Sequence, residues 1–407
     1  MGSKLLYFTN SYPFGIGEQW KANELNVLVK HFDKITVVPF SYGGNFNTPK
    51  QLPNGVELVG PLFREQDIKM RKIDLFRILF RRDVFKFARE FIGKGVYLSK
   101  GHLINWISGS FNVVRLLGNN LIVKLLVEAD SETVLYFYWG QGSCEILPFI
   151  HKRFHRTFVR MHRYDLFEYL NDGYIPYRER LLDVINIAAP SSLIGQLHLR
   201  GIYPRAKASI EVVRCGTKGN GKISAASRDN VMRVASCSLL SPVKRVHLMI
   251  ECLQFIGFPI LWRHIGDGAQ MEELKQLVEN LGLGDTFIFE GLMDSSVILD
   301  FYTENSFDVF VNTSSSEGVP FSIMEAFSVG IPVIATNVGG TSEIVDETNG
   351  ILVREDLTPS NLAIELAQFY QLSIDKKLKM RQSSFLKYRE MCDSDILTER
   401  LASILKQ

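Results

Sequence analysis

The chain has 407 residues, of which 46% are hydrophobic and 22% charged, and its formal net charge is +2. This length suits two domains of about 200 residues each, and the composition is typical of a soluble globular protein. The five cysteines are scattered and form no CxxC pair, which argues against a disulfide framework or a zinc site and favours a reducing compartment. We expect no signal peptide and no transmembrane helix, because no apolar run reaches the length of about 18 residues.

The net charge conceals an asymmetry between the two halves of the chain. Residues 1–204 include 26 basic and 18 acidic residues, whereas residues 205–407 include 20 basic and 26 acidic ones. Such an asymmetry favours a charged partner for the first half. Nucleic acid, an anionic membrane surface or a phosphorylated acceptor would each fit it.

The first half shows the alternation of a doubly wound α/β domain. A strand at 4–9, a loop with two glycines, a helix at 23–30 and a strand at 34–40 form its predicted opening. Further strands are predicted at residues 133–138, 157–161 and 184–189. Residues 209–213 are predicted to open the crossing into the second domain.

Residues 73–92 combine apolar side chains at helical spacing with basic side chains between them. This pattern predicts a basic amphipathic helix or pair of helices. Two interpretations remain open, a solvated face on a core helix and contact with a membrane surface.

The second half repeats the alternation of strands and helices. Its predicted strands are residues 231–236, 260–265, 286–289, 309–312 and 333–336. Its predicted helices are residues 243–255, 271–280, 297–304 and 323–329, followed by terminal helices within residues 369–407. The short apolar strands at 309–311 and 333–335 are typical of strands buried on both faces.

The most informative stretch is residues 312–325, NTSSSEGVPFSIME, where a predicted strand ends and a helix begins. Ligands of doubly wound sheets bind at such a junction. Pro320 suits the first position of a helix, because an N–H there would have no partner. The amides of Val319, Phe321 and Ser322 would then point out of a helix N-terminus, which binds phosphate through free N–H groups and the helix dipole.

Two glutamates flank this predicted helix start. Glu317 lies just before the helix, and Glu325 lies about two turns further along. One carboxylate can lie beside a sugar and the other beside a ribose, because carboxylate oxygens accept hydroxyl hydrogen bonds. A helix-start charge and a surface residue are the structural alternative, which the strand–loop–helix setting disfavours.

The spacing Glu317-x7-Glu325 and the surrounding SEGVPFSIMEAFSVGIPVIATNVGGTSEIV resemble the signature of family 4 glycosyltransferases. Residues 236–251 resemble the family segment that contacts donor phosphates, and residues 264–268 resemble its Gly-rich turn. The resemblance implies the α/β GT-B fold, with two Rossmann-like domains facing a central cleft. We expect an N-terminal acceptor-side domain at 1–208, a nucleotide-sugar domain at 209–384 and a helix at about 385–407 that packs back on the first domain.

The resemblance implies roles for residues of the second half. Glu317 would contact the donor sugar hydroxyls, Glu325 would hold the ribose, and Lys244 would neutralise the departing diphosphate. The remaining donor contacts would come from Gly266, from the backbone at Gly291 and Leu292, and from Gly318, Val319, Pro320 and Phe321. The family usually has an arginine where this chain has Leu239, so the diphosphate loses one bidentate donor.

The first half matches the family through the loop of Gly15 and Gly17 and through RMHRYD. The two glycines would let this loop approach the donor or acceptor closely. The resemblance implies that His162 lies near the reacting sugar, although a buried structural histidine is the alternative. Acceptor-binding roles are expected for Glu18, Arg163 and Asp165.

The basic segment 151–163 permits two interpretations, a solvated positive face and recognition of a phosphate-bearing acceptor such as a lipid-linked oligosaccharide. Nucleic acid is not expected as a partner, because no RNA-binding motif accompanies the charge. The resemblance places the chain in the cytoplasm, with peripheral contact with an anionic inner membrane face as an open option.

Sugar transfer builds negative charge on the leaving diphosphate, and a fixed cation with a helix N-terminus stabilises that charge. We therefore expect neither a metal nor a cofactor, and a UDP- or GDP-sugar as the donor substrate. The predicted function is retaining transfer of a sugar to a hydroxyl of a glycan or lipid-linked saccharide in bacterial surface polysaccharide synthesis. The alternatives are a non-catalytic nucleotide-sugar-binding protein and an epimerase of the same fold.

Overall fold

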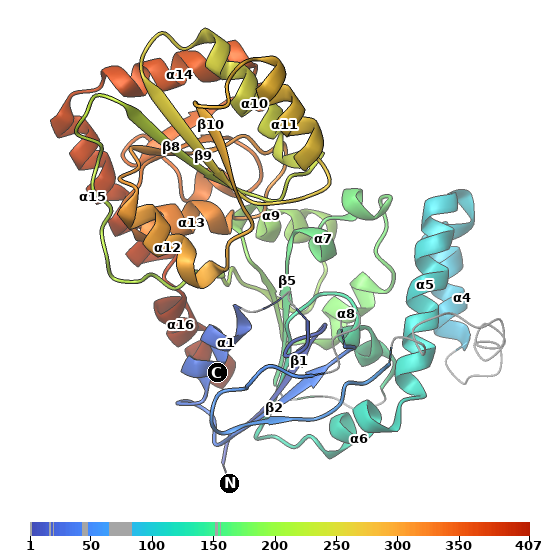
Figure 1. The fold of residues 1–407 in the computed structure, drawn as a ribbon. Coiled ribbons are helices and arrows are strands. Elements are labelled where there is room, and N and C mark those ends of the chain that lie inside the picture. The colour runs from blue at the N-terminus through green and yellow to red at the C-terminus, as the bar shows by residue number, and fades with distance from the viewer. Residues whose placement is uncertain are drawn as a thin grey trace. The chain divides into compact units, whose positions relative to one another are not determined.

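The computed structural model describes residues 2–15, 18, 20–42, 48–64, 84–150, 154 and 156–407. The chain divides into two compact units, Met1–Val213 with Thr398–Gln407, and Arg214–Leu397. Figure 1 shows that helices surround a sheet in each unit. Both sheets are entirely parallel, which confirms the predicted α/β class with two Rossmann-like units.

The sheet of the first unit has the order β3-β2-β1-β4-β5-β6-β7. Its strands are β1 (Lys4–Thr9), β2 (Lys34–Pro39), β3 (Val56–Leu58), β4 (Thr133–Phe137), β5 (Arg156–Met161), β6 (Ile187–Pro190) and β7 (Ser209–Ile210). Alternate residues of β1 enter different cores, Leu5 and Tyr7 on one face and Leu6 and Phe8 on the other. This period of two explains why the strand reads as an uninterrupted apolar run.

The helices of the first unit cover both faces of its sheet. They are α1 (Lys21–Leu28), α4 (Val84–Gly93), α5 (Lys100–Leu117), α6 (Asn120–Glu128), α7 (Arg163–Leu166), α8 (Arg178–Val184) and α9 (Leu193–Ile202). Asn119 begins α6 by accepting hydrogen bonds from the amides of Leu121 and Ile122. No single helix among the described residues is long and apolar enough to cross a membrane, although α5 and α6 satisfy that criterion together as a pair bent by 70°.

The last helix of the chain, α16 (Ser394–Lys406), contributes to the core of the first unit. Leu401, Ala402 and Leu405 pack in the same cluster as Leu5 and Tyr7. The chain therefore returns to the first unit after completing the second.

The second unit has a sheet in the order β10-β9-β8-β11-β12-β13. Its strands are β8 (Met232–Cys237), β9 (Ile260–Ile265), β10 (Phe287–Gly291), β11 (Val309–Asn312), β12 (Val333–Thr336) and β13 (Gly350–Val353). Val309 and Val311 of β11 pack on one face, and Phe310 packs on the other.

Two layers of helices enclose this second sheet. One layer comprises α10 (Val246–Glu251), α11 (Met271–Asn280) and α14 (Pro359–Gln371). The other comprises α12 (Ser295–Glu304), α13 (Phe321–Ser328) and α15 (Ile374–Met391). This arrangement buries all four residues of β11.

The structure corrects several predicted elements. Residues 209–213 do not open the second domain, because β7 pairs with β6 at the edge of the first sheet. The predicted helix at 243–255 is broken at Arg245, which has a left-handed φ of 50°. Val184 ends α8 instead of starting a strand. The domain boundary was predicted between residues 208 and 209, whereas the two units divide between Val213 and Arg214.

We predict that Leu401→Ala destabilises the first unit by about 2–5 kcal/mol, because Leu401 is fully buried and truncation leaves a cavity. Urea unfolding followed by circular dichroism measures this loss. Leu386→Ala on α15 is the matched control, since Leu386 is 59% exposed. Equal stability of the two variants would show that α16 does not contribute to the core.

Candidate functional site

The candidate site of the second unit lies where β11 ends and α13 begins. Residues 313–320 form the connecting loop, and the helix starts at Phe321. The sequence predicted Pro320 as the first helical residue, but Pro320 is the residue before the helix. Pro320 has an extended backbone with a ψ of 120°, which is the non-helical conformation usual for an N-cap residue.

Lys244 and Glu317 form an ion pair at this junction. The Lys244 Nζ lies 2.6 Å from the Glu317 Oε1, and the two side chains are 24% and 11% exposed. The side-chain amide of Asn312 also donates to the Glu317 Oε1, over 3.3 Å. Two residues to which the resemblance gives a role are thus brought together across 73 positions of sequence.

Arg245 fixes the loop that carries Lys244 to the loop that carries Glu317. Its guanidinium donates to the carbonyl oxygens of Thr313, Ser314 and Glu355. The Thr313 hydroxyl in return donates to the Lys244 carbonyl, over 2.9 Å. Because these contacts occupy the Arg245 side chain, it supports the loops and does not stand in for an arginine at Leu239, which is 66% exposed.

Two glycines after β12 complete the loop around Glu317. A Cβ on Gly339, which has a φ of 54°, would lie 1.9 Å from the Glu317 carbonyl oxygen. The Gly340 amide donates to the Gly318 carbonyl, over 2.7 Å. Only glycine permits this close approach of two backbones.

Several amides at the start of α13 lack a hydrogen-bond acceptor among the residues that the structure describes. Within the described chain, the amides of Gly318, Val319 and Ser322 have no hydrogen-bond acceptor. The first-turn amides of any helix lack intrahelical partners and carry the positive end of the helix dipole. Together with Lys244 they form a positive region suited to an anion.

Glu325 is a half-buried carboxylate one turn into α13. Its side chain has no hydrogen-bond or ion-pair partner among the residues that the structure describes. Burial raises the pKa of Glu325 to about 7. A carboxylate that is desolvated without a partner is a marker of a functional site, because a ligand can supply the missing donors.

The Gly-rich turn after β9 and the end of β10 lie together. The Gly266 amide donates to the Gly291 carbonyl, over 2.8 Å, and Gly266 has a φ of 147°. A Cβ on Gly266 would lie 1.9 Å from the Ser238 carbonyl oxygen. Leu292, which follows Gly291 in the chain, is 74% exposed. The predicted donor-contact residues of both loops thus lie at the carboxyl end of neighbouring strands.

In the first unit, the predicted acceptor residue Glu18 is engaged within the protein. Its carboxylate accepts hydrogen bonds from the amides of Ser11 and Tyr12 and pairs with the buried Lys21. Burial alone would raise the pKa of Glu18, but the charge of Lys21 and these hydrogen bonds lower it below its ordinary value. The Trp139 indole N–H also donates to this carboxylate.

His162 lies at the end of β5 and stacks on the ring of Tyr138, with centroids 5.1 Å apart. Its Nε2 is buried and has no hydrogen-bond partner among the described residues. Burial, and then the positive charges of Arg160 and Lys21, lower the pKa of His162 to about 3. The imidazole is therefore neutral at pH 7 and can accept or donate a hydrogen bond without carrying charge.

The remaining predicted residues of the first unit occupy different environments. Asp165 is 2% exposed, and its carboxylate accepts hydrogen bonds from the amides of Gly140 and His162. Burial raises the pKa of Asp165 to about 6. Arg163 is half-buried, and Gly15 has a left-handed φ of 74°. Gly17, His151, His155 and residues 73–83 of the predicted basic helix lie outside the described residues.

Sequence reasoning missed several residues that build these sites. Asn312, Gly339 and Gly340 shape the Glu317 loop, and Lys21 and Trp139 surround Glu18. A pair of glycines three and four residues after a buried strand was a usable signal for a close backbone approach. The position of Lys21 had no such signal, because its burial depends on a partner that lies across a loop.

Residues 224–385 match the family described as Glycosyl transferases group 1. This stretch contains Lys244, Glu317, Glu325 and the two glycines after β12, which form the geometry above.

Curated relatives are similar to part of this chain. The putative colanic acid biosynthesis glycosyltransferase WcaL of Escherichia coli is 29% identical over 185 residues, which is 43% of this chain and 45% of the relative. The lipopolysaccharide core biosynthesis mannosyltransferase LpsB of Rhizobium meliloti is 38% identical over 114 residues, 27% of this chain and 31% of the relative. The matches thus span less than half the length of these relatives.

Solved structures are similar in fold over nearly the whole chain. HepE of Anabaena, solved in complex with UDP, has a TM-score of 0.64 at 18% identity and covers 99% of each chain. The lipopolysaccharide outer core galactosyltransferase WaaB has a TM-score of 0.62 at 15% identity, covering 99% of this chain and all of the other. The fold is therefore that of the two-domain GT-B glycosyltransferases.

We predict that Glu325→Gln stabilises the protein at pH 8 by about 2 kcal/mol but has little effect at pH 4.5. A carboxyl whose folded pKa is raised to about 7 binds its proton more tightly in the folded state, so stability falls as pH rises from the unfolded pKa through 7. Glutamine stays neutral and escapes this loss. Urea unfolding at both pH values measures the difference.

The matched control is Glu272→Gln, since the Glu272 side chain is 90% exposed. It should change the stability little at either pH. A Glu325→Gln effect that is the same at pH 4.5 and pH 8 would contradict an elevated pKa at this position.

Proposed function

We propose that this chain is a retaining glycosyltransferase that moves a sugar from a nucleotide-sugar donor to a hydroxyl of a glycan or lipid-linked saccharide acceptor. The observation that carries the proposal is the Lys244–Glu317 pair beside the free amides at the start of α13, with the unpartnered Glu325 carboxylate one turn further along. The match of residues 224–385 to the family Glycosyl transferases group 1 supports the reaction class.

The charges at this site suit a departing nucleoside diphosphate. Loss of the sugar leaves negative charge on the diphosphate, and the Lys244 ammonium with the amides of Gly318, Val319 and Ser322 would stabilise it where it develops. Glu317 would accept hydrogen bonds from the donor sugar hydroxyls, and Glu325 would accept them from the ribose. Because Lys244 and the helix N-terminus supply this positive charge, the proposed reaction needs no metal and no cofactor.

A UDP-sugar is the favoured donor within this proposal. HepE of Anabaena binds UDP, according to its solved complex, and it shares the fold of this chain. The relatives named for colanic acid and lipopolysaccharide core synthesis favour a bacterial surface polysaccharide as the product. Retention of the anomeric configuration is proposed from the family 4 resemblance of the Glu317-x7-Glu325 segment.

In the first unit, the neutral His162 is proposed to meet the reacting sugar. The His162 Nε2 has no partner among the described residues, so it is able to form a hydrogen bond with the sugar. The low pKa of His162 keeps the imidazole uncharged beside a positively charged transition state. Glu18 and Asp165 would act through the loops that they hold, since their carboxylates already accept hydrogen bonds from backbone amides.

We predict that Glu317→Gln lowers kcat/KM for sugar transfer by about 100-fold or more, because the amide cannot hold the sugar hydroxyls or pair with Lys244 as a carboxylate does. The donor is identified first. UDP- and GDP-sugars are screened by thermal shift and then by release of nucleoside diphosphate. Assays of the variant with and without EDTA then measure turnover and its dependence on metal.

Glu272→Gln is the control for this substitution and should retain full turnover. Near-native thermal unfolding of Glu317→Gln would show that the loss is catalytic. Unchanged turnover in Glu317→Gln would contradict the assignment of this site. Nucleotide-sugar binding without any diphosphate release would instead favour the non-catalytic binding protein.

We also propose that the first unit contacts an anionic membrane surface peripherally, on the cytoplasmic side. Helices α4 and α5 and the short turn η1 (Val96–Leu98) between them expose large apolar side chains. The exposed fractions are 81% for Phe85, 68% for Ile92, 60% for Tyr97, 77% for Leu98 and 54% for Ile104. Exposed Arg89 and Lys100 lie on the same segments, a combination that suits an anionic lipid surface.

We predict that Phe85→Ser/Leu98→Ser reduces co-sedimentation with phosphatidylglycerol vesicles by about tenfold, because each buried apolar side chain adds to membrane affinity. The double variant Ile364→Ser/Leu386→Ser, at exposed positions of α14 and α15, is the control and should bind as the wild type. Vesicle binding that survives loss of both Phe85 and Leu98 would contradict the assignment of this surface.

A further inference from the structure

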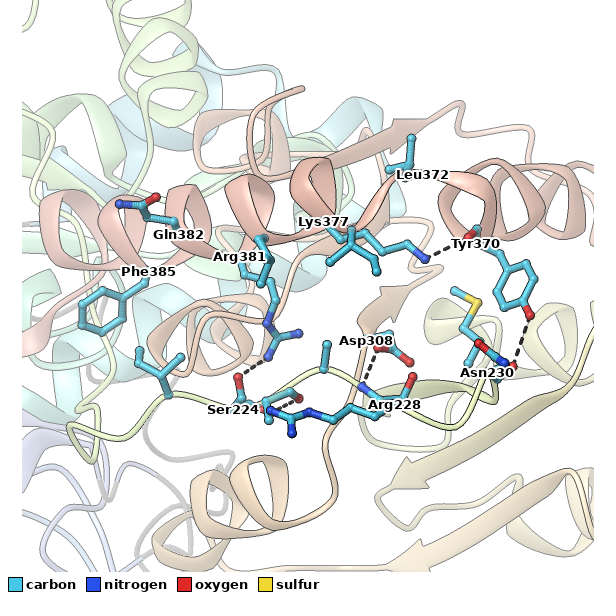
Figure 2. Close-up of a pocket in the computed structure, with 17 residues that line it drawn as sticks. Ser224, Arg228, Asn230, Asp308, Tyr370, Leu372, Lys377, Arg381, Gln382 and Phe385 are labelled. Atoms are coloured by element: carbon cyan, nitrogen blue, oxygen red, sulfur yellow. Dashed lines mark hydrogen bonds between the residues drawn. The ribbon is translucent and has the colours of Figure 1, made fainter.

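The second unit contains a pocket of about 1050 Å³ that is separate from the Glu317 site. Figure 2 shows α15 along one side of this pocket and the extended segment from Ser224 to Asn230 along the other. Asp308, which directly precedes β11, lies at its base. The pocket thus adjoins the amino end of β11, whereas Glu317 follows its carboxyl end. Its volume is that of a site for a small organic molecule.

Three cations line this pocket without a carboxylate partner in the part of the chain that the structure describes. They are Arg228, Lys377 and Arg381. Arg381 is 6% exposed, and its guanidinium donates to the carbonyl oxygens of Ser224 and Phe307. These bonds use two of the five N–H donors of the guanidinium. A buried charge without a counter-ion is costly, so such a group is expected to meet an anion.

Asp308 lines the pocket, but each of its carboxylate oxygens already accepts a hydrogen bond from a backbone amide. Asp308 accepts hydrogen bonds from the amides of Ser227 and Arg233, one on each oxygen. Burial lowers the pKa of Arg381 to about 10 despite the nearby charge of Asp308, and it lowers the pKa of Lys377. Arg381 therefore remains charged at neutral pH, and the lining has three basic side chains against the single carboxylate of Asp308.

Apolar side chains of α15 and of Ile223 form another part of the pocket wall. Ile374 and Leu378 lie one turn apart on α15 and are 77% and 54% exposed, and Phe385 and Ile223 extend this apolar wall. Lys377 is held toward the end of α14 by its bond to the Tyr370 carbonyl, over 2.8 Å, as Figure 2 shows. An inorganic anion would satisfy the cations but would leave this apolar surface uncovered.

We propose that this pocket binds an amphipathic organic anion, with its carboxylate or phosphate group attracted by the positive charge that Arg228, Lys377 and Arg381 give the lining, and an aliphatic body against Ile374, Leu378 and Phe385. The inference does not depend on the proposed sugar transfer, because none of these residues belongs to the Glu317 site. The ligand chemistry is that of a fatty carboxylate or an alkyl phosphate.

Isothermal titration of the full chain with decanoate and with octyl phosphate, below their micelle-forming concentrations, tests this site. We expect one binding site for each probe, with affinity reduced about tenfold in Arg228→Gln and in Lys377→Gln through loss of a charge-assisted contact. Leu378→Ala should weaken decanoate binding as well. Acetate and inorganic phosphate should bind much more weakly than the two amphiphiles.

Lys379→Gln and Leu386→Ala are the matched controls, since both residues are exposed on α15 and neither lines the pocket. Both controls should bind the probes as the wild type does. Absence of binding to the wild type, or equal affinities in Arg228→Gln, Lys377→Gln and Lys379→Gln, would overturn the proposal. Equal binding of inorganic phosphate and octyl phosphate would overturn the aliphatic part of it.

Titration with UDP in the same variants separates this inference from the proposed function. Arg228→Gln and Lys377→Gln should bind UDP as the wild type does while losing the amphiphile. A chain that binds decanoate but no nucleotide would retain the pocket and lose the proposed transferase site.

Discussion

The ion pair between Lys244 and Glu317 is the interaction on which the candidate site depends. It joins the turn before α10 to the loop before α13, and both segments are held by further bonds from Arg245 and Thr313 to backbone carbonyls. A half-buried pair of this kind adds little net stability, because desolvation offsets much of the attraction. Its value is positional, since it sets a cation and a carboxylate side by side at the positive end of a helix.

The second unit places unpartnered charge at both ends of β11. Glu325 is an unpaired carboxylate near its carboxyl end, and Arg381 is a buried guanidinium near its amino end. In a folded protein most buried charges are paired, so each exception indicates a place where a ligand supplies the missing partner. The four residues of β11 lie between the Arg381 pocket and the Glu317 site along the chain.

The first unit satisfies its charges differently. Glu18 pairs with Lys21, and Glu24 pairs with Arg160 over 2.7 Å, all deep in the unit. These pairs surround the aromatic rings of Tyr138 and Trp139 and leave His162 neutral, with one nitrogen unused. The Lys21 and Glu18 charges thus neutralise each other within the unit, whereas the second unit has a carboxylate, Glu325, without a partner among the described residues.

The amino-acid sequence by itself determined the class of fold and the core of the candidate site. The apolar strands at 4–9, 260–265, 309–312 and 333–336 lie where they were predicted, because strands buried on both faces carry a strong local pattern. Glu317 and Glu325 were predictable because their spacing and the adjacent helix start are local in sequence. The segment 209–213 was misassigned, because membership of a sheet edge depends on a partner strand.

Tertiary structure alone decided which residues meet. Lys244 and Glu317 are 73 positions apart, and although the family resemblance implied roles for both at one donor site, no local pattern in either segment predicts their direct contact. The bracing role of Arg245, the burial of Lys21 and the unpaired state of Arg381 likewise depend on neighbours contributed by distant segments. Local patterns specify which face of an element is apolar, whereas the pairing of individual charges is fixed only once the elements have packed.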